Sequence, residues 1–197
     1  MPFMGSTVIQ TVTAVTYSLT LNPLPTLASE GSTVGFSGTL TANGSGVPGA
    51  TIRIDYTNAT GDITGTVGTT TTDSNGNFSL NWKIPYGLGC QQYYFYAVDV
   101  ASGTISNKPA MKIGVNTRIV LSLPQTVTVN VPFTVSGTLQ WYDGSSWKPL
   151  PNMKVTVSLD GNVVAQPTTD ANGNFSASIT ITSAGSHSIM AQFAGTS

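Results

Sequence analysis

The chain has 197 residues, of which 8% are charged and 40% are hydrophobic, and its formal net charge is −1. So low a charge offers no basic surface for nucleic acid or for an anionic membrane. The apolar residues occur in runs too short to span a bilayer. No basic start followed by an aliphatic core marks a signal peptide, so export would need either no signal or a leader preceding Met1.

The first predicted element is Ser6–Thr16, STVIQTVTAVT, which has no charge, no Gly and no Pro. Its Val, Ile and Thr residues favour an extended chain, and as a strand it would span about 36 Å. Its apolar side chains fall on two faces, with Val8, Val12 and Ala14 on one and Ile9 and Val15 on the other. A strand that is half apolar on both faces needs cover on both sides.

From Tyr17 onward the chain contains an internal repeat. TVGFSGTL at Thr33–Leu40 is echoed by FTVSGTL at Phe133–Leu139, and TTDSNGNFSL at Thr71–Leu80 is echoed by TTDANGNFSASI at Thr168–Ile179. Each copy is about a hundred residues long, which is the usual size of one β-sandwich domain. The predicted organisation is an N-terminal strand at 1–16, one sandwich at 17–117 and a second at 118–197.

Strands are predicted throughout both copies, because apolar residues alternate with period two and turn dipeptides such as Asn75-Gly76 separate the runs. The first copy has seven predicted strands, near 18–28, 33–41, 50–57, 63–70, 76–83, 92–100 and 104–115. The second has six, near 118–129, 133–141, 153–160, 162–168, 174–181 and 186–193. We therefore expect an all-β fold whose second sandwich lacks its last strand.

Four runs carry a family resemblance: VPGATIRI, TTDSNGNF, TTDANGNF and GSHSIMAQFAG. They resemble the bacterial and archaeal immunoglobulin-like repeats of surface-layer proteins and adhesins. The resemblance covers residues 17–197 and implies two tandem immunoglobulin-like β-sandwiches, although a fold of this kind does not specify function. In that family a segment similar to AQFAG leads into one more strand that closes the domain.

A sandwich without its last strand leaves backbone groups unpaired and core side chains wet, which native proteins avoid. Ser6–Thr16 is the candidate supplier, and insertion into a second copy would resemble donor-strand complementation of pili. Donor and acceptor at opposite ends of the chain predict a head-to-tail filament of identical copies, on a cell or a virus particle. The alternative is a tandem module of a surface-layer protein or adhesin, with the N-terminal segment as a flexible leader or first strand.

Catalytic and metal-binding groups are sparse, and no cofactor is predicted. Asp73–Asn77 and Asp170–Asn174 resemble the start of a calcium loop but lack the acidic residue at the twelfth position, so hairpin turns are favoured. The single histidine, His187, has no catalytic partner in the sequence, and the interpretation favours a packing or surface role. The lone thiol of Cys90 is expected to be a small buried hydrophobe, with an interchain bridge as the alternative.

Two further groups suggest partners. In the aromatic run Tyr93–Tyr96, alternate residues face outward, either Tyr94 and Tyr96 or Tyr93 and Phe95. The outward side chains, with Trp141 and Trp147 of a predicted loop, could contact another subunit or stack on surface glycans, and the candidates are Tyr94, Tyr96, Trp141 and Trp147. Asn-x-Ser/Thr triplets on predicted turns favour an extracellular glycoprotein, and they occur at Asn43, Asn58, Asn77 and Asn174. The sequence thus predicts a non-enzymatic structural protein of a surface filament, with a binding module as the competing class.

Overall fold

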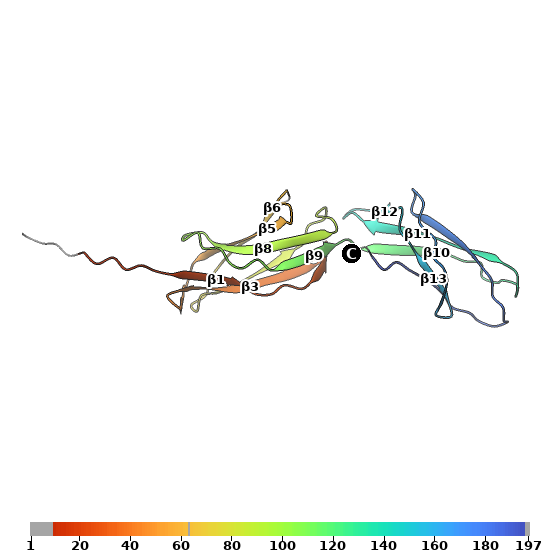
Figure 1. The fold of residues 1–197 in the computed structure, drawn as a ribbon, viewed down its shortest axis with the longest axis horizontal. Helices are drawn as coiled ribbons and strands as arrows, with labels where there is room; N and C mark the ends of the chain where they lie inside the picture. Colours follow the sequence, from red (N-terminus) through yellow and green to blue (C-terminus); the bar gives the residue numbers. More distant parts are fainter. Residues whose placement is uncertain (1–9, 63, 196–197) are drawn as a thin grey trace, which may run out of the picture. The chain divides into compact units, whose positions relative to one another are not determined.

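The computed structural model describes residues 10–62 and 64–195. Within those ranges the chain forms sixteen β-strands and no helix, so it has no helix that could cross a membrane. It divides into two compact units (Figure 1). The first extends to Ile113 and the second begins at Gly114, except that the loops Ser29–Gly31 and Pro85–Cys90 group with the second.

The first unit is a sandwich of two sheets. One sheet contains β1 (Tyr17–Leu21), β3 (Thr33–Ala42), β4 (Ser45–Gly46) and β7 (Asn77–Lys83). The other has the strand order β2 (Leu27–Ser29), β9 (Ala110–Gly114), β8 (Gln91–Asp99), β5 (Thr51–Asn58) and β6 (Thr64–Thr71). The strand β9 therefore lies between β2 and β8, inside the sheet.

The core of the first unit follows the period-two alternation of its strands. Phe36 and Leu40 of β3 are buried, as are Tyr93 and Phe95 of β8. The Phe36 and Phe95 rings lie 5.2 Å apart, which joins the two sheets through aromatic contact. Inward residues from both sheets thus fill one continuous interior, as in an immunoglobulin-like sandwich.

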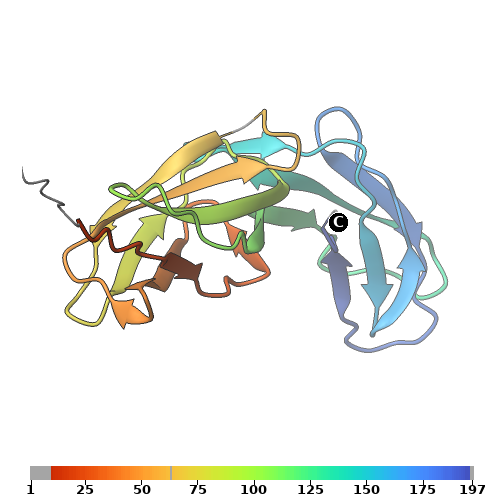
Figure 2. The same cartoon turned by 60° about the vertical axis from the view of Figure 1, so that its left-hand side comes forward.

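The second unit repeats this plan with fewer strands. One sheet contains β10 (Thr117–Ser122), β11 (Phe133–Tyr142), β12 (Trp147–Pro149) and β15 (Asn174–Ile179). The other has the order β14 (Asn162–Ala165), β13 (Thr156–Leu159) and β16 (Ile189–Gln192), at the blue end of the scale in Figure 2. Among the described residues, this three-stranded sheet has no counterpart of β2 or β9.

These sheets confirm the predicted all-β fold of two immunoglobulin-like sandwiches, but several predicted strands are too long, and two of them are interrupted near prolines. The strand predicted near 18–28 is broken into β1 and β2, and the one near 118–129 ends with β10 at Ser122. Prolines follow both breaks, at Pro23 and Pro124. A proline has no N–H for the ladder, which ends pairing there.

A repeated glycine brings neighbouring chains close in both units. Gly38 of β3 and Gly137 of β11 occupy equivalent positions in FTVSGTL-like runs, and each lies against the ring of a buried phenylalanine. A Cβ at Gly137 would lie 2.6 Å from the Val120 carbonyl oxygen and 2.7 Å from Cζ of Phe175. Neither neighbour can move without disturbing the ladder or the core.

We expect Gly38→Ala to destabilise the protein by about 1–3 kcal/mol, because the added methyl group overpacks the Thr20 carbonyl and the Phe78 ring. Gly35→Ala in the same strand is the matched control, since its Cβ would meet only the flexible end of Asn81 at 3.3 Å. Urea denaturation of both variants measures the difference. Equal stabilities would contradict the role of close approach at Gly38.

Candidate functional site at the edge of β16

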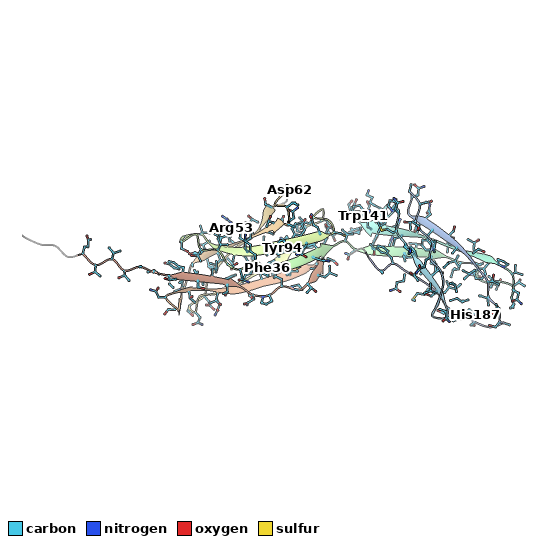
Figure 3. All side chains as sticks on the ribbon, in the orientation of Figure 1. Phe36, Arg53, Asp62, Tyr94, Trp141 and His187 are labelled. Atoms are coloured by element: carbon cyan, nitrogen blue, oxygen red, sulfur yellow. The ribbon has the colours of Figure 1, made fainter. Side chains whose placement is uncertain are left out.

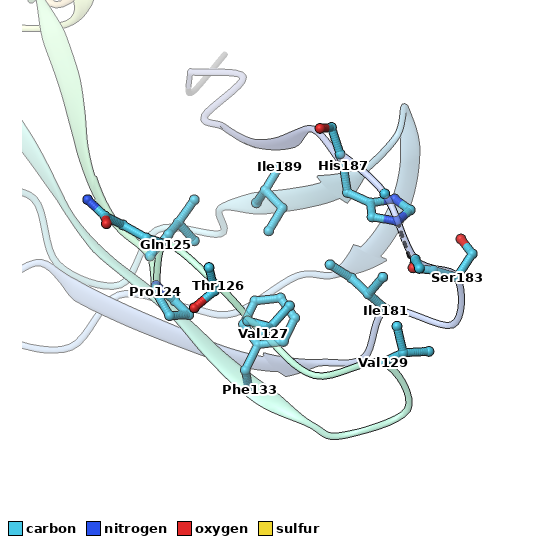
Figure 4. A pocket seen from close by; sticks show the side chains of 14 residues that line it. Pro124, Gln125, Thr126, Val127, Val129, Phe133, Ile181, Ser183, His187 and Ile189 are labelled. Atoms are coloured by element: carbon cyan, nitrogen blue, oxygen red, sulfur yellow. Dashed lines mark hydrogen bonds between the residues drawn. The ribbon is translucent and has the colours of Figure 1, made fainter.

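An open groove of about 470 Å³ lies beside β16 in the second unit (Figure 4). Its walls come from the segments 123–129 and 183–189, and the side chains of Phe133, Ile181 and Ile189 contribute apolar surface between them. The lining contains no Asp, Glu, Lys or Arg. It is therefore suited to an uncharged occupant that presents apolar side chains to Phe133, Ile181 and Ile189 and polar groups to the rest of the lining.

The pairing registers identify what fills the equivalent place in the first unit. Ile54 pairs with Ala97 there, and the repeat-related Val157 pairs with Ala191, so β16 corresponds to the second half of β8. In the first unit β8 pairs on its other side with β9. The groove thus occupies the position that β9 fills in the first unit.

β16 is shorter than β8, and in the part of the second unit that the structure describes no strand lies in the position of β9. The first part of β8, Gln91–Tyr94, pairs with β9, whereas the corresponding residues 185–188 belong to no strand. The strand predicted near 186–193 is consequently only Ile189–Gln192. Phe95 is fully buried, but its counterpart Ile189 is only half-buried. The described second unit is thus a sandwich with one side of its core uncovered.

The titratable group on the groove wall is His187, which corresponds to the buried Tyr93 of the first unit. Its Nδ1 lies 2.7 Å from Oδ2 of Asp160, and its Nε2 lies 3.0 Å from the Ser183 carbonyl oxygen. The hydrogen bond to Asp160 raises the pKa of His187, and the same bond lowers the pKa of Asp160. These contacts fix the ring on the groove wall, consistent with a packing role.

The pair makes the stability of the second unit depend on pH. The raised pKa of His187 contributes stability below about pH 6.5 that is lost as pH rises through the folded value, and the lowered pKa of Asp160 contributes stability above about pH 4 that is lost on acidification. We expect an NMR titration of this single histidine to give a pKa above about 6.5, and Asp160→Asn to lower it. A pKa unchanged by Asp160→Asn would contradict the pairing.

The predicted donor segment is described from Gln10 onward, whereas Val8 and Ile9 lie outside the described residues. Residues 10–16 are exposed and belong to no strand, and Figure 1 shows them leading away from β1. Val12 is 89% exposed, and Ala14 and Val15 are also exposed. These apolar side chains lack the cover that their sequence pattern requires.

The segment passes into the first unit without a linker. The Thr16 N–H donates to Oδ1 of Asn43 at 2.9 Å, and the Thr16 carbonyl accepts from the Asn43 N–H at 2.9 Å. Asn43 lies at a turn with φ of 50°, a conformation that asparagine tolerates well. Sheet pairing thus begins at Thr16, and the residues before it are free to pair elsewhere.

The predicted contact aromatics lie in different units, and Figure 3 labels Tyr94 in the first and Trp141 in the second. Tyr94 and Tyr96 are half-buried on the outer face of β8, and Lys108 Nζ lies 4.9 Å from the Tyr96 ring centroid. In the second unit the Trp147 ring stacks on the Arg118 guanidinium at 4.3 Å, and Trp141 is half-buried on β11. Intrachain contacts therefore already engage Tyr96 and Trp147.

The four glycosylation candidates differ in accessibility. Asn43, Asn77 and Asn174 are exposed, whereas Asn58 is half-buried. Three of them use their side-chain amides within the chain: Asn43 accepts from Thr16, Asn77 accepts from the Thr39 hydroxyl, and Asn174 donates to Asp170.

The aspartates of the two calcium-like runs cap their hairpin turns. Oδ1 of Asp73 accepts the N–H groups of Asn75 and Asn77, and Asp170 does the same for Asn172 and Asn174. These backbone donors lower the pKa of both carboxyl groups. Across residues 10–62 and 64–195, no three His, Cys, Asp or Glu side chains are placed to hold a metal ion.

Cys90 is exposed, contrary to the expectation of a buried thiol. It lies in the loop between β7 and β8, outside the alternating pattern that buries strand residues. Loops run mostly over the surface, which accounts for the exposure of this small side chain.

No family model and no curated protein sequence matches the chain. Similar solved structures include a tetra-tandem repeat from the extending region of a large adhesion protein, with 23% identity over 85% of this chain and 42% of that one and a TM-score of 0.43. The adhesin InvE of Yersinia pseudotuberculosis has 16% identity over 83% and 51%, with a TM-score of 0.41. The D0-D1 domain of intimin has 18% identity over 91% of both chains, with a TM-score of 0.34.

Proposed function

We propose that the chain is a non-enzymatic structural protein of an extracellular surface, and that copies join head-to-tail when the N-terminal segment of one enters the β16 groove of the next. The observation that carries the proposal is the groove itself, which lies where β9 completes the first unit. An inserted strand would form backbone hydrogen bonds with the edge of β16, and its side chains would cover the exposed part of the core. Both gains favour an inserted strand.

The segment Ser6–Thr16 matches this groove in chemistry. It carries no charge, and the groove lining contains no Asp, Glu, Lys or Arg. Its described apolar residues are exposed, so insertion would remove them from water, which contributes about 25 cal/mol per Å² of apolar surface. An uncharged segment with exposed apolar side chains and an uncharged groove with exposed apolar residues thus occur in one chain, and insertion would cover both.

The connection between the two units supplies a precedent for the proposed joint. In the chain itself β9 is followed after only Val115 and Asn116 by β10, the first strand of the next sandwich. A donated Ser6–Thr16 would likewise be followed directly by β1, the first strand of its own sandwich. The proposed joint between copies has the same strand order as the joint within the chain.

The competing function is a tandem module of a longer surface adhesin. In the first unit the strand that fills this position, β9, comes from the same chain, and ten residues separate its start at Ala110 from the end of β8 at Asp99. A following segment of the same chain would then fill the groove of the second unit. In that case the N-terminal segment would have no part in assembly.

We expect the full chain to form fibres in negative-stain images and to scatter light as a polymer, whereas deletion of Met1–Thr16 gives folded monomers. A peptide with the sequence Ser6–Thr16 should bind these monomers and block fibre growth of the full chain. Monomers of the full chain that are indifferent to the deletion would contradict strand donation and support the adhesin module.

A matched pair of variants tests whether this groove is the site that accepts the donor strand. Val127 lines the groove and is 36% exposed, whereas Val131 is 51% exposed and does not line it. We expect Val127→Asp to weaken peptide binding at least about tenfold, because a carboxylate would be buried without a partner, and Val131→Asp to leave it unchanged. Equal binding by both variants would exclude this groove as the acceptor.

A further inference from the structure

We propose that the donated segment pairs with the groove edge in one antiparallel register, in which Thr13 lies opposite Ser186 of the next copy. Val12 then faces the groove opposite His187, and Ala14 faces it opposite Gly185. This inference rests on the proposed strand donation and specifies which donor side chains enter the core.

The β8–β9 ladder of the first unit shows which positions of the slot are deep. Met111 pairs with Tyr93 and Ile113 pairs with Gln91, and both β9 side chains are 1% exposed. Two residues earlier on the same face, Pro109 is only half-buried, and Asn107, two residues before that, is exposed. A strand in the position of β9 therefore needs apolar side chains at two positions, those of Met111 and Ile113, which are two residues apart. At the positions of Pro109 and Asn107 the side chains are more exposed, so polar residues are acceptable there.

The residues of the second unit that correspond to these two pairs can be identified from the strand registers. Tyr93 corresponds to His187 through the shared registers of β5 with β8 and of β13 with β16, so Gln91 corresponds to Gly185. Both His187 and Gly185 line the groove. The open space is thus located where Met111 and Ile113 lie in the first unit.

Only one pair of residues in Ser6–Thr16 satisfies this demand. Val12 and Ala14 are the sole apolar residues separated by two positions in that segment. A shift by two residues would place Gln10 in a deep position, and a shift by one would place Thr11 and Thr13 there. Each alternative turns polar side chains into positions that Met111 and Ile113 fill in the first unit, and burying a polar group without a hydrogen-bond partner costs free energy.

The length of the joint is compatible with this register. Ile119 and Leu19 are equivalent, because Ile119 pairs with Leu139 and Leu19 pairs with the repeat-related Leu40. Within the chain, Ile119 follows Ile113 by six residues. Leu19 follows Ala14 by five residues, so the joint between copies is shorter by one residue than the joint within the chain. The hydrogen bonds of Thr16 to Asn43 leave Val15 as the residue at which the segment passes between copies.

Disulfide trapping between two different variants tests the register. The Phe95 N–H donates to the Pro109 carbonyl, so Gln92 and Lys112 form a non-hydrogen-bonded pair, whose close Cα atoms suit a disulfide. Ser186 and Thr13 are the equivalent pair and both are exposed. In a Cys90→Ser background, Ser186→Cys protein is mixed with Thr13→Cys, Val12→Cys or Thr11→Cys protein and oxidised mildly.

We expect the Thr13→Cys mixture to give at least about tenfold more covalent dimer on a non-reducing gel than the other two, because neighbouring positions face away or lie one pair further along. Faster trapping with Val12→Cys or Thr11→Cys would overturn this register while leaving strand donation intact. Fibres in which none of the three pairs is trapped would overturn the register as well. Absence of fibres and of dimers in every mixture would instead contradict the proposed function.

Discussion

The ladder between β8 and β9 is the interaction that distinguishes the two units. In the first unit it orders Gln91–Tyr94 as strand and covers Tyr93 and Phe95. In the second unit the described residues offer β16 no such partner, and the equivalents of those residues leave the strand and the core stays half-covered. The extended conformation of Gln91–Tyr94 and the burial of this part of the core thus both depend on the presence of β9. Removing the ladder affects both together, because the same strand supplies the donors and the lid.

The low number of charged residues limits the part that ion pairs can play in this protein. With fifteen charged residues in 197, the described ion pairs are few and local, such as Arg53 with Asp55 at 2.8 Å. Recognition between copies would then depend on backbone pairing and apolar fit, and ionic strength should affect it little. The His187–Asp160 pair is the exception, since it places a titratable group on the groove wall.

The repeat in the sequence was sufficient to predict two sandwiches, because alternation and Asn-Gly turns are local signals that each copy carries in full. It also predicted that the second copy is short of a strand. The strand near 186–193 was predicted too long, because the sequence of residues 186–188 is compatible with a strand, whereas the described second unit has no strand in the position of β9. The hydrogen bond from Thr16 to Asn43 was not predictable, because it joins residues 27 positions apart through a side chain. Nor does local sequence reveal the buried carboxylate of Glu30, which accepts the N–H groups of Gly87 and Gly89.

The direct passage from Thr16 into β1 has a mechanical consequence. If the preceding residues are paired in a neighbouring copy, tension reaches each sandwich along the axis of a strand. A load in that direction strains all hydrogen bonds of a ladder at once, whereas a load across it opens them one at a time. A thread built this way would resist stretching strongly while its joints, each nearly without slack, would transmit force from copy to copy.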